Sequence, residues 1–377
     1  MDIGKFKLPG EGQGDRLILA DGHKAILIQP NIASRMTDAD AVDVRTVAIY
    51  GNDLLAQQEN TDRFYLADLS VSSPTWAALD FATAESQTDK LLRIYRDRDT
   101  IILFGDTSTE FWTNTGGQDV PYSPIRGSMI EWGLAARWSV AKADGVLIFL
   151  ARNPSGQVRL VRLNGYQAVP VSDQEWDALV NDYSRTDDAE AFSYTMGGHP
   201  FYQITFPTAC KTWLFDGSTG MFSELQSGDS RHRARVHEYV WNTHFVTDYE
   251  NGKIYKLKAG VYADNGTEIQ REIRTRHFFK DYDRVTVSEL QLDFDPGVGL
   301  DSGQGSNPQV MLQISKDNGK GYGTELWKSI GAGGKTLTRA VWRRLGMGRD
   351  WVFKIRMSDP VPFRVTGASI DATPLKG

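Results

Sequence analysis

The chain has 377 residues, of which 40% are hydrophobic and 24% charged, as is usual for a soluble folded protein. Its formal net charge of -6 argues against tight binding to duplex DNA, which demands a strongly basic face. The single cysteine, Cys210, excludes an intramolecular disulfide framework, and we expect it to be small, apolar and buried.

The amino end and the hydropathy pattern predict where the chain is made. Residues 1–15 have no apolar core of the kind found in signal peptides. No run approaches the roughly 18 apolar residues that span a bilayer. We therefore expect assembly in the cytoplasm and no membrane insertion.

Strand signals dominate the chain as far as about Leu257. Short runs of β-branched and aromatic residues are separated by Asn-Gly and Asp-Gly pairs, which supply the positive φ angles of tight hairpin turns. Such turns are predicted at residues 142–145, 153–156, 164–165, 216–220 and 250–252. The roughly even spacing predicts a mainly β fold, built as a β-propeller or another sheet repeat with few short helices.

One helix is expected directly after residue 172. Ser172 to Glu175 read as a capping box, with the Ser172 hydroxyl as the N-cap. Apolar residues then follow at helical spacing: Trp176, Leu179, Val180 and Tyr183. We interpret this as a helix docked between two repeats. A second helix over residues 81–92 is a weaker prediction, since its periodicity is poor.

The composition changes after residue 257, which suggests three parts. We expect an N-terminal β segment at 1–60, a propeller-like body at 61–257 and a smaller C-terminal β-domain at 258–377. In the last part, Ser315 to Tyr322 resembles the Asp-box turn of sialidase-type hairpins, where the Asp and Gly fix the turn and an aromatic residue plugs it. That motif is a folding device with no catalytic implication.

No catalytic or metal-binding spacing is present. His232, His237 and His244 lack the close companions that a metal site needs, and His199 lies between Gly and Pro at an expected turn. No serine-hydrolase elbow, phosphate loop or calcium loop occurs, so no cofactor is predicted. Three acids near tryptophans, Asp80, Glu85 and Glu110, are candidates for glycoside chemistry or, alternatively, surface acids beside core or interface tryptophans.

Two basic groups allow more than one interpretation. Arg231, Arg233 and Arg235 alternate, so a continuous strand would place all three on one face. Arg343, Arg344, Arg349 and Arg356 gather in sequence near the carboxyl end. Each group fits a solvated face or salt bridges between subunits. The alternative is contact with an acidic neighbour or with passing DNA.

Five strings together resemble one protein family. They are WAALDFATAE (76–85), TIILFGDTSTEFWTNTGG (100–117), AFSYTMGGHPFYQITFPTACKTWLFDGSTG (191–220), GKIYKL (252–257) and VWRRLGMGRDWVFKIRMSDPV (341–361). In this order they resemble the packaged-DNA stabilisation proteins, also called tail hub or nozzle proteins, of short-tailed bacteriophages. Residues 1–60 match that family poorly.

The resemblance assigns structural rather than catalytic importance to a set of signature residues. They are Trp76, Asp80, Glu85, Gly105, Glu110, Trp112, Gly116, His199, Phe201, Tyr202, Phe206, Pro207, Trp213, Asp216, Trp342, Arg343, Arg344, Arg349, Asp350, Asp359 and Pro360.

The resemblance also implies a function. It implies a non-enzymatic hexameric ring in the virion tail, below the portal and its adaptor. The ring would extend and close the DNA channel, retain packaged DNA, let it pass on ejection, and dock tail spikes, fibres or a needle. Two other classes stay open: a carbohydrate-binding or carbohydrate-cleaving propeller, and a nucleic-acid-binding module, whose DNA affinity would depend steeply on salt.

Overall fold

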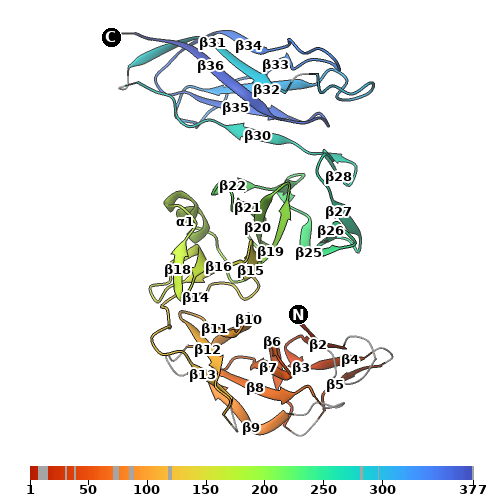
Figure 1. The fold of residues 1–377 in the computed structure, drawn as a ribbon. Coiled ribbons are helices and arrows are strands. Elements are labelled where there is room, and N and C mark those ends of the chain that lie inside the picture. The colour runs from red at the N-terminus through yellow and green to blue at the C-terminus, as the bar shows by residue number, and fades with distance from the viewer. Residues whose placement is uncertain are drawn as a thin grey trace. The chain divides into compact units, whose positions relative to one another are not determined.

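The computed structural model describes residues 1–6, 16–29, 32–37, 40–70, 76–84, 89–117, 121–280, 283–295 and 297–375, with backbone alone at 6 and 77–80. The chain forms two compact units (Figure 1). The first unit comprises Met1–Gln226 and Arg231–Tyr255, and the second comprises Ser227–Ser230 and Lys256–Gly377.

Six antiparallel sheets make up the described part of the first unit, and they follow one another along the chain except that β3 joins the second sheet. The first has the order β1-β2-β4-β5: β1 (Asp2–Phe6), β2 (Arg16–Ala20), β4 (Ile26–Gln29), β5 (Ile32–Arg35). The second has the order β3-β6-β7-β8-β9: β3 (His23–Lys24), β6 (Asp43–Tyr50), β7 (Asp53–Gln58), β8 (Arg63–Asp68), β9 (Trp76–Thr83). The third is β10 (Leu91–Asp97), β11 (Thr100–Gly105), β12 (Thr109–Asn114), β13 (Tyr122–Pro124).

The remaining three sheets follow the same plan. The fourth has β14 (Gly133–Leu134), β15 (Ala141–Ala143), β16 (Val146–Arg152), β17 (Val158–Asn164), β18 (Gln167–Pro170). The fifth has β19 (Glu190–Met196), β20 (His199–Phe206), β21 (Lys211–Asp216), β22 (Met221–Glu224). The sixth has β25 (Ala234–Val240), β26 (Thr243–Asp248), β27 (Ile254–Leu257).

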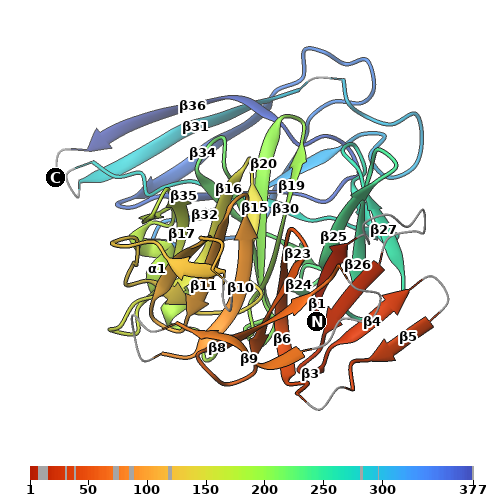
Figure 2. The ribbon, with the colours of Figure 1, turned by 60° about the horizontal axis from the view of Figure 1, so that its bottom comes forward.

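Each of these sheets packs on the next one along the chain. β1 contacts β6, β6 contacts β10, β11 contacts β14, β15 contacts β19, and β19 contacts β25. In Figure 2 the strands β1, β10, β15, β19 and β25 lie toward the middle of the unit, and later strands such as β5, β17 and β27 lie toward its periphery. Sheets that succeed one another face to face around a middle are the arrangement of a propeller.

The core of this unit is divided among the interfaces between successive sheets. Ile18 and Leu54 belong to the interface of the first two sheets. Phe64 and Trp112 meet edge to face between the second and third sheets, with ring centroids 5.5 Å apart. Phe104 and Phe149 do the same between the third and fourth sheets, at 5.0 Å. The second, third and fourth sheets therefore bury both faces of central strands such as β7, β11 and β16, which read as continuous apolar runs rather than as alternating ones.

The predicted hairpin turns are present. Asp144 and Gly145 join β15 to β16 with φ angles of 48° and 76°. Cys210 lies in the turn between β20 and β21 with a φ of 53° and is exposed. The prediction of a buried Cys210 is therefore wrong, because its turn directs it out to solvent.

The helix α1 (Gln174–Asn181) forms where it was predicted, but its cap is different. Asp173 is the N-cap, and its carboxylate accepts a hydrogen bond from Trp176 N at 2.8 Å. The Ser172 hydroxyl instead donates to Asp177 Oδ1. Trp176 and Val180 are buried in the core between the fourth and fifth sheets. The helix predicted over residues 81–92 is wrong where the structure describes it, since β9 runs to Thr83 and β10 begins at Leu91.

The second unit has two sheets around one core, at the blue end of the chain in Figure 1. One sheet has the order β30 (Arg271–Arg274), β35 (Val352–Met357), β32 (Gln309–Ser315), β33 (Leu326–Ser329). The other has the order β34 (Ala340–Gly348), β31 (Arg284–Phe294), β36 (Val365–Leu375). Trp351 and Trp342 are buried in the core. Two short ribbons complete the strands: β23 (Gln226–Ser227) with β24 (Ser230–Arg231), and β28 (Ala263–Asp264) with β29 (Thr267–Glu268).

The Asp-box-like turn follows β32. Asp317 Oδ1 accepts hydrogen bonds from the Ser315 hydroxyl at 2.7 Å and from Gly321 N at 2.9 Å. These bonds hold the pKa of Asp317 below its usual value. Tyr322 is half-buried, and the Lys354 ammonium lies 3.9 Å from its ring centroid. The Tyr322 hydroxyl faces Gly319 of the turn, 3.8 Å from where a Cβ atom of that residue would lie. Among the described residues, no helix is long and apolar enough to span a membrane.

Candidate functional site

The most specific signature string folds as the fifth sheet. His199 begins β20 and Asp216 ends β21, so antiparallel pairing brings together two residues that are distant in sequence. His199 Nδ1 and Asp216 Oδ2 are 2.9 Å apart. Burial alone would raise the pKa of Asp216, but hydrogen bonds from Ser218 N, His199 and Thr219 outweigh burial and lower it. The pair fixes the turn after β21.

Other signature side chains attach this sheet to its neighbours. The Tyr202 hydroxyl donates to the Ser139 carbonyl at 2.6 Å, and burial raises the pKa of Tyr202 well above its usual value. Trp213 Nε1 donates to the Tyr183 hydroxyl at 3.1 Å. Phe206 packs edge to face on Tyr183, with centroids 5.1 Å apart. Phe201 stacks on the His199 ring at 5.9 Å.

A carboxylate that the sequence did not single out anchors the third sheet. Asp89 Oδ2 accepts hydrogen bonds from Thr107 N at 2.8 Å and from Ser108 N at 3.0 Å. A Cβ atom at position 105 would lie 2.5 Å from the same oxygen, which explains the signature glycine Gly105. Asp89 precedes the turn by 18 residues, and no local pattern links the two.

The acids proposed for sugar chemistry do not assemble into a described site. Glu110 is buried and accepts a hydrogen bond from Trp112 Nε1 at 2.9 Å. The side chain of Asp80 and the whole of Glu85 lie outside the described residues. Of the nearby signature residues, Trp76 is buried in the core of the first two sheets, and Gly116 has a φ of 71° in the turn after β12.

The C-terminal signature residues also make structural contacts. Trp342 Nε1 donates to the Leu326 carbonyl at 3.0 Å, Asp350 lies 2.9 Å from His277 Nδ1, and Asp359 Oδ2 accepts a hydrogen bond from Gln309 N at 2.7 Å. Pro360 directly follows Asp359, and Gly305 approaches its ring.

The second group of arginines is spread over both sheets of this unit. Arg343 on β34 pairs with Glu289 at 2.7 Å, whereas Arg356 on β35 pairs with Glu272 at 2.6 Å. Arg344 is exposed, with a φ of 60°, and Arg349 follows the end of β34. Arg343 and Arg356 are therefore each paired with a carboxylate of the same unit.

The first group of arginines does not share one strand face. The backbone leaves strand geometry at His232 and Arg233, between β24 and β25. Arg233 forms an ion pair with the fully buried carboxylate of Asp248 at 2.9 Å. Arg231 and Arg235 instead line a cavity of about 740 Å³ in the first unit, and Pro207 is another of its lining residues. The expectation of one common face is wrong because the strand breaks between them.

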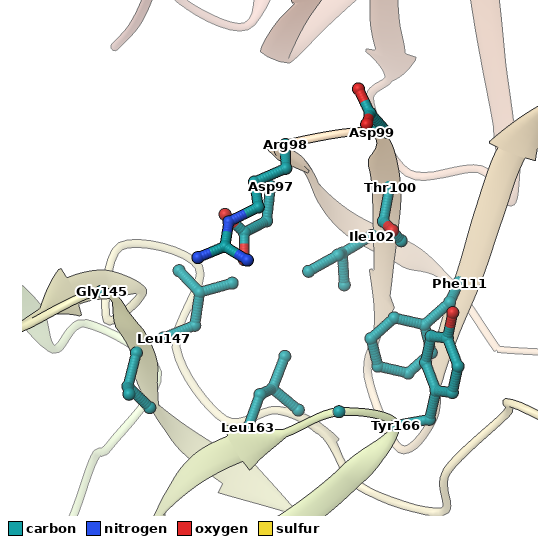
Figure 3. Close-up of a pocket in the computed structure, with 12 residues that line it drawn as sticks. Asp97, Arg98, Asp99, Thr100, Ile102, Phe111, Gly145, Leu147, Leu163 and Tyr166 are labelled. Atoms are coloured by element: carbon teal, nitrogen blue, oxygen red, sulfur yellow. The ribbon is translucent and has the colours of Figure 1, made fainter.

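Two smaller hollows lie at hairpin ends of the same unit. One, of about 420 Å³, lies between turns of the third and fourth sheets. Figure 3 shows Ile102, Leu147 and Leu163 pointing into it, with Tyr166 beside Phe111. The other, of about 460 Å³, contains His237 and His244, whose Nε2 and Nδ1 atoms are 2.9 Å apart. Burial, with a contribution from His244, lowers the pKa of His237 to about 4. No cluster of three or more metal-binding side chains occurs among the described residues.

These observations define a class: a two-part β protein in which the described signature residues mainly pack, cap turns and join sheets. Comparison with known proteins gives the family. The description "Bacteriophage P22 Gp10, beta-propeller" matches residues 12–262, and "Bacteriophage P22 Gp10, beta-sandwich" matches residues 270–373. The chain belongs to the bacteriophage P22 Gp10 family, which confirms the resemblance to phage tail hub proteins and the predicted fold class.

Two individual proteins are similar to this chain. The tail hub protein gp10 of Salmonella phage P22 is 21% identical over 325 residues, which are 83% of this chain and 67% of that protein. The solved structure of Hsv2 from Kluyveromyces lactis is 11% identical and covers 62% of this chain and 66% of its own, with a TM-score of 0.37. That structural likeness is too low to carry an argument. The chain spans about two thirds of the length of each protein.

Proposed function

We propose that this protein is a structural hub of a phage tail. Copies of it form a hexameric ring below the portal and its adaptor, which extends the DNA channel and closes it on the packaged DNA. The ring docks tail spikes, fibres or a needle, and DNA passes through it on ejection. The observation that carries this proposal is the match, in order, of both Gp10 family descriptions over most of the chain.

The described signature residues support a structural rather than an enzymatic role. The histidines and the buried acid that could act as catalytic groups in an enzyme already have hydrogen-bond partners. His199 pairs with Asp216, Glu110 accepts from Trp112, and His277 pairs with Asp350. These bonds fix turns and strand ends, which suits a part that must stay rigid under the pressure of packaged DNA. Such a part would belong to the virion tail after assembly in the host cytoplasm.

An exposed apolar surface supports contact with other protein chains. Large apolar side chains stand out from the fifth and sixth sheets and the turn between β25 and β26: Met221, Val236, Tyr239, Trp241 and Ile254. Trp241 is 87% exposed, and its φ of 50° is unusual for a bulky residue. Large exposed apolar residues that gather on successive sheets suit a protein interface, where aromatic residues are enriched.

Electron microscopy of the purified protein, alone and mixed with its adaptor, tests the proposal. We expect rings of one size. The double variant Trp241→Asp/Ile254→Asp should lose ring formation while its circular dichroism is unchanged. Leu179→Asp, at a 40% exposed position on α1, is the matched control and should still assemble. A protein that stays monomeric with the adaptor and other tail partners would contradict the proposal. Binding or turnover of a sugar in a glycan screen would favour the carbohydrate alternative.

A further inference from the structure

The cavity of about 740 Å³ lies where the innermost strands of the propeller begin. Arg45 is near the start of β6, and Leu92 is near the start of β10. Trp138 lies three residues before β15, and Glu190 opens β19. Arg231 and Arg235 flank the start of β25. Five of the six sheets thus contribute to one wall, so the cavity is a product of the whole propeller. Its volume falls within the roughly 300–1,000 Å³ of small-molecule sites.

The side chains that line this cavity carry more positive than negative charge. Six arginines line it: Arg45, Arg137, Arg152, Arg185, Arg231 and Arg235. Four carboxylates oppose them, at Asp106, Asp187, Asp188 and Glu190, which leaves a formal excess of two positive charges. Glu59 does not line the cavity itself, but it forms ion pairs with both Arg45 and Arg137. Its carboxylate lowers the formal excess to one positive charge.

Three of the six arginines have a carboxylate of their own. Arg152 pairs with Asp106 at 2.8 Å, Arg185 with Asp187 at 2.5 Å, and Arg235 with Glu190 at 2.8 Å. These pairs hold the guanidinium groups in place around the cavity. The net positive charge of the cavity therefore does not come from Arg152, Arg185 or Arg235.

Arg231 differs from the other five. Its guanidinium carbon lies 3.8 Å from the ring centroid of Tyr249, and no carboxylate of the described residues comes within 4.0 Å of it. A guanidinium that stacks on an aromatic ring keeps its in-plane N–H donors available at its edge. This geometry suits a planar or tetrahedral oxyanion, which takes two parallel hydrogen bonds from one guanidinium.

We propose that the cavity binds a compact anion of the phosphate type with two or more negative charges, held by Arg231 and the neighbouring arginine edges. The excess positive charge disfavours a neutral ligand, and the bidentate fork of arginine favours phosphate oxygens. Arg231 and Arg235, the second of which has a 55% exposed side chain, then serve this site rather than a surface that faces passing DNA.

Calorimetric titration of the full chain with sodium diphosphate, at constant ionic strength, tests this assignment. We expect saturable binding, weakened about tenfold or more by Arg231→Gln, because a charge-assisted hydrogen bond is lost. Arg231→Lys should retain part of the affinity. Arg162→Gln is the matched control, since Arg162 is exposed on β17 outside the cavity, and it should bind as the wild type does. No saturable binding, or equal weakening by both glutamine variants, would overturn the proposal.

A second measurement needs no variant. Phenylglyoxal modifies accessible arginines, and mass spectrometry locates the modified sites. Diphosphate should protect Arg231 and Arg235 but not Arg162. Protection of the same two residues by a short DNA duplex, and not by diphosphate, would show that they face DNA and would overturn the assignment. This outcome is independent of ring formation, so the two proposals can fail separately.

Discussion

Single carboxylates determine how several turns of this protein are built. Asp89, Asp216 and Asp317 each accept hydrogen bonds from backbone N–H groups of a turn that closes a hairpin or joins strands. A turn leaves such donors without a partner in the ladder, and a buried donor without a partner destabilises the fold. These three carboxylates therefore satisfy backbone donors of the turns.

Gly105→Ala tests one of these anchors. A methyl group there would lie 2.5 Å from Asp89 Oδ2 and 2.6 Å from Oδ1, so the carboxylate must move away from the turn. We expect the free energy of unfolding to fall by about 2 kcal/mol, as for other changes that break a polar network. Urea denaturation measures this change.

Gly252→Ala is the control for that substitution, since a Cβ there meets nothing within 4 Å. It should change stability by less than about 0.5 kcal/mol. The double variant Asp89→Ala/Gly105→Ala should lose less than the sum of its single changes, because both act on one contact. Equal stability of the Gly105 and Gly252 variants would refute the steric account.

At the scale of elements, α1 shows which features of a helix can be predicted from a local sequence motif. The apolar spacing places the helix correctly, and Trp176 and Val180 are buried four residues apart on one side. Leu179 of the predicted stripe is instead 40% exposed. The cap is one residue later than predicted. The Ser172 hydroxyl is used by Asp177 and by Leu160 N of the adjacent strand, and this leaves Asp173 as the N-cap. Tertiary contacts thus overrode the capping box.

Asp173→Ala tests the cap. It removes the acceptor for Trp176 N, and we expect a loss of about 1 kcal/mol of stability. Glu175→Ala is the matched control. Glu175 is exposed in the first turn, and its removal should cost less than about 0.5 kcal/mol. A loss from Glu175→Ala as large as that from Asp173→Ala would restore the predicted capping box. Both losses are measured by urea denaturation.

At the scale of the whole molecule, the chain has two cores. The sheets of the first unit share interfaces in series, whereas the second unit has one core between its two sheets. Separate cores predict separate unfolding transitions. The division of the first unit at residue 60 stays a prediction.

Paired substitutions test this independence by calorimetry. Ile148→Val in the first unit and Ile355→Val in the second remove the same methylene group from positions that are each 4% exposed. Each change should cost about 1 kcal/mol and lower the midpoint of its own transition by roughly 2–8 °C, leaving the other midpoint unchanged. A single transition that both variants shift would show that the units unfold together.

The sequence by itself determined the features that depend on neighbouring residues. Asn-Gly and Asp-Gly turns, short strand runs and one apolar stripe are local, and they predicted a mainly β chain of hairpins with one docked helix. The roughly even spacing of those runs predicted a propeller or another sheet repeat, and the family strings added the tail hub resemblance. Only the tertiary structure decided which groups meet. Asp89 accepts hydrogen bonds from a turn 18 residues later in the chain, and Arg233 forms an ion pair with Asp248. Arg231 and Arg235 line one cavity together with arginines from other sheets. The reason is that hydrogen bonds and ion pairs between sheets depend on how the strands pack in space. The spacing of two residues along the chain does not determine how far apart their side chains lie in the folded protein.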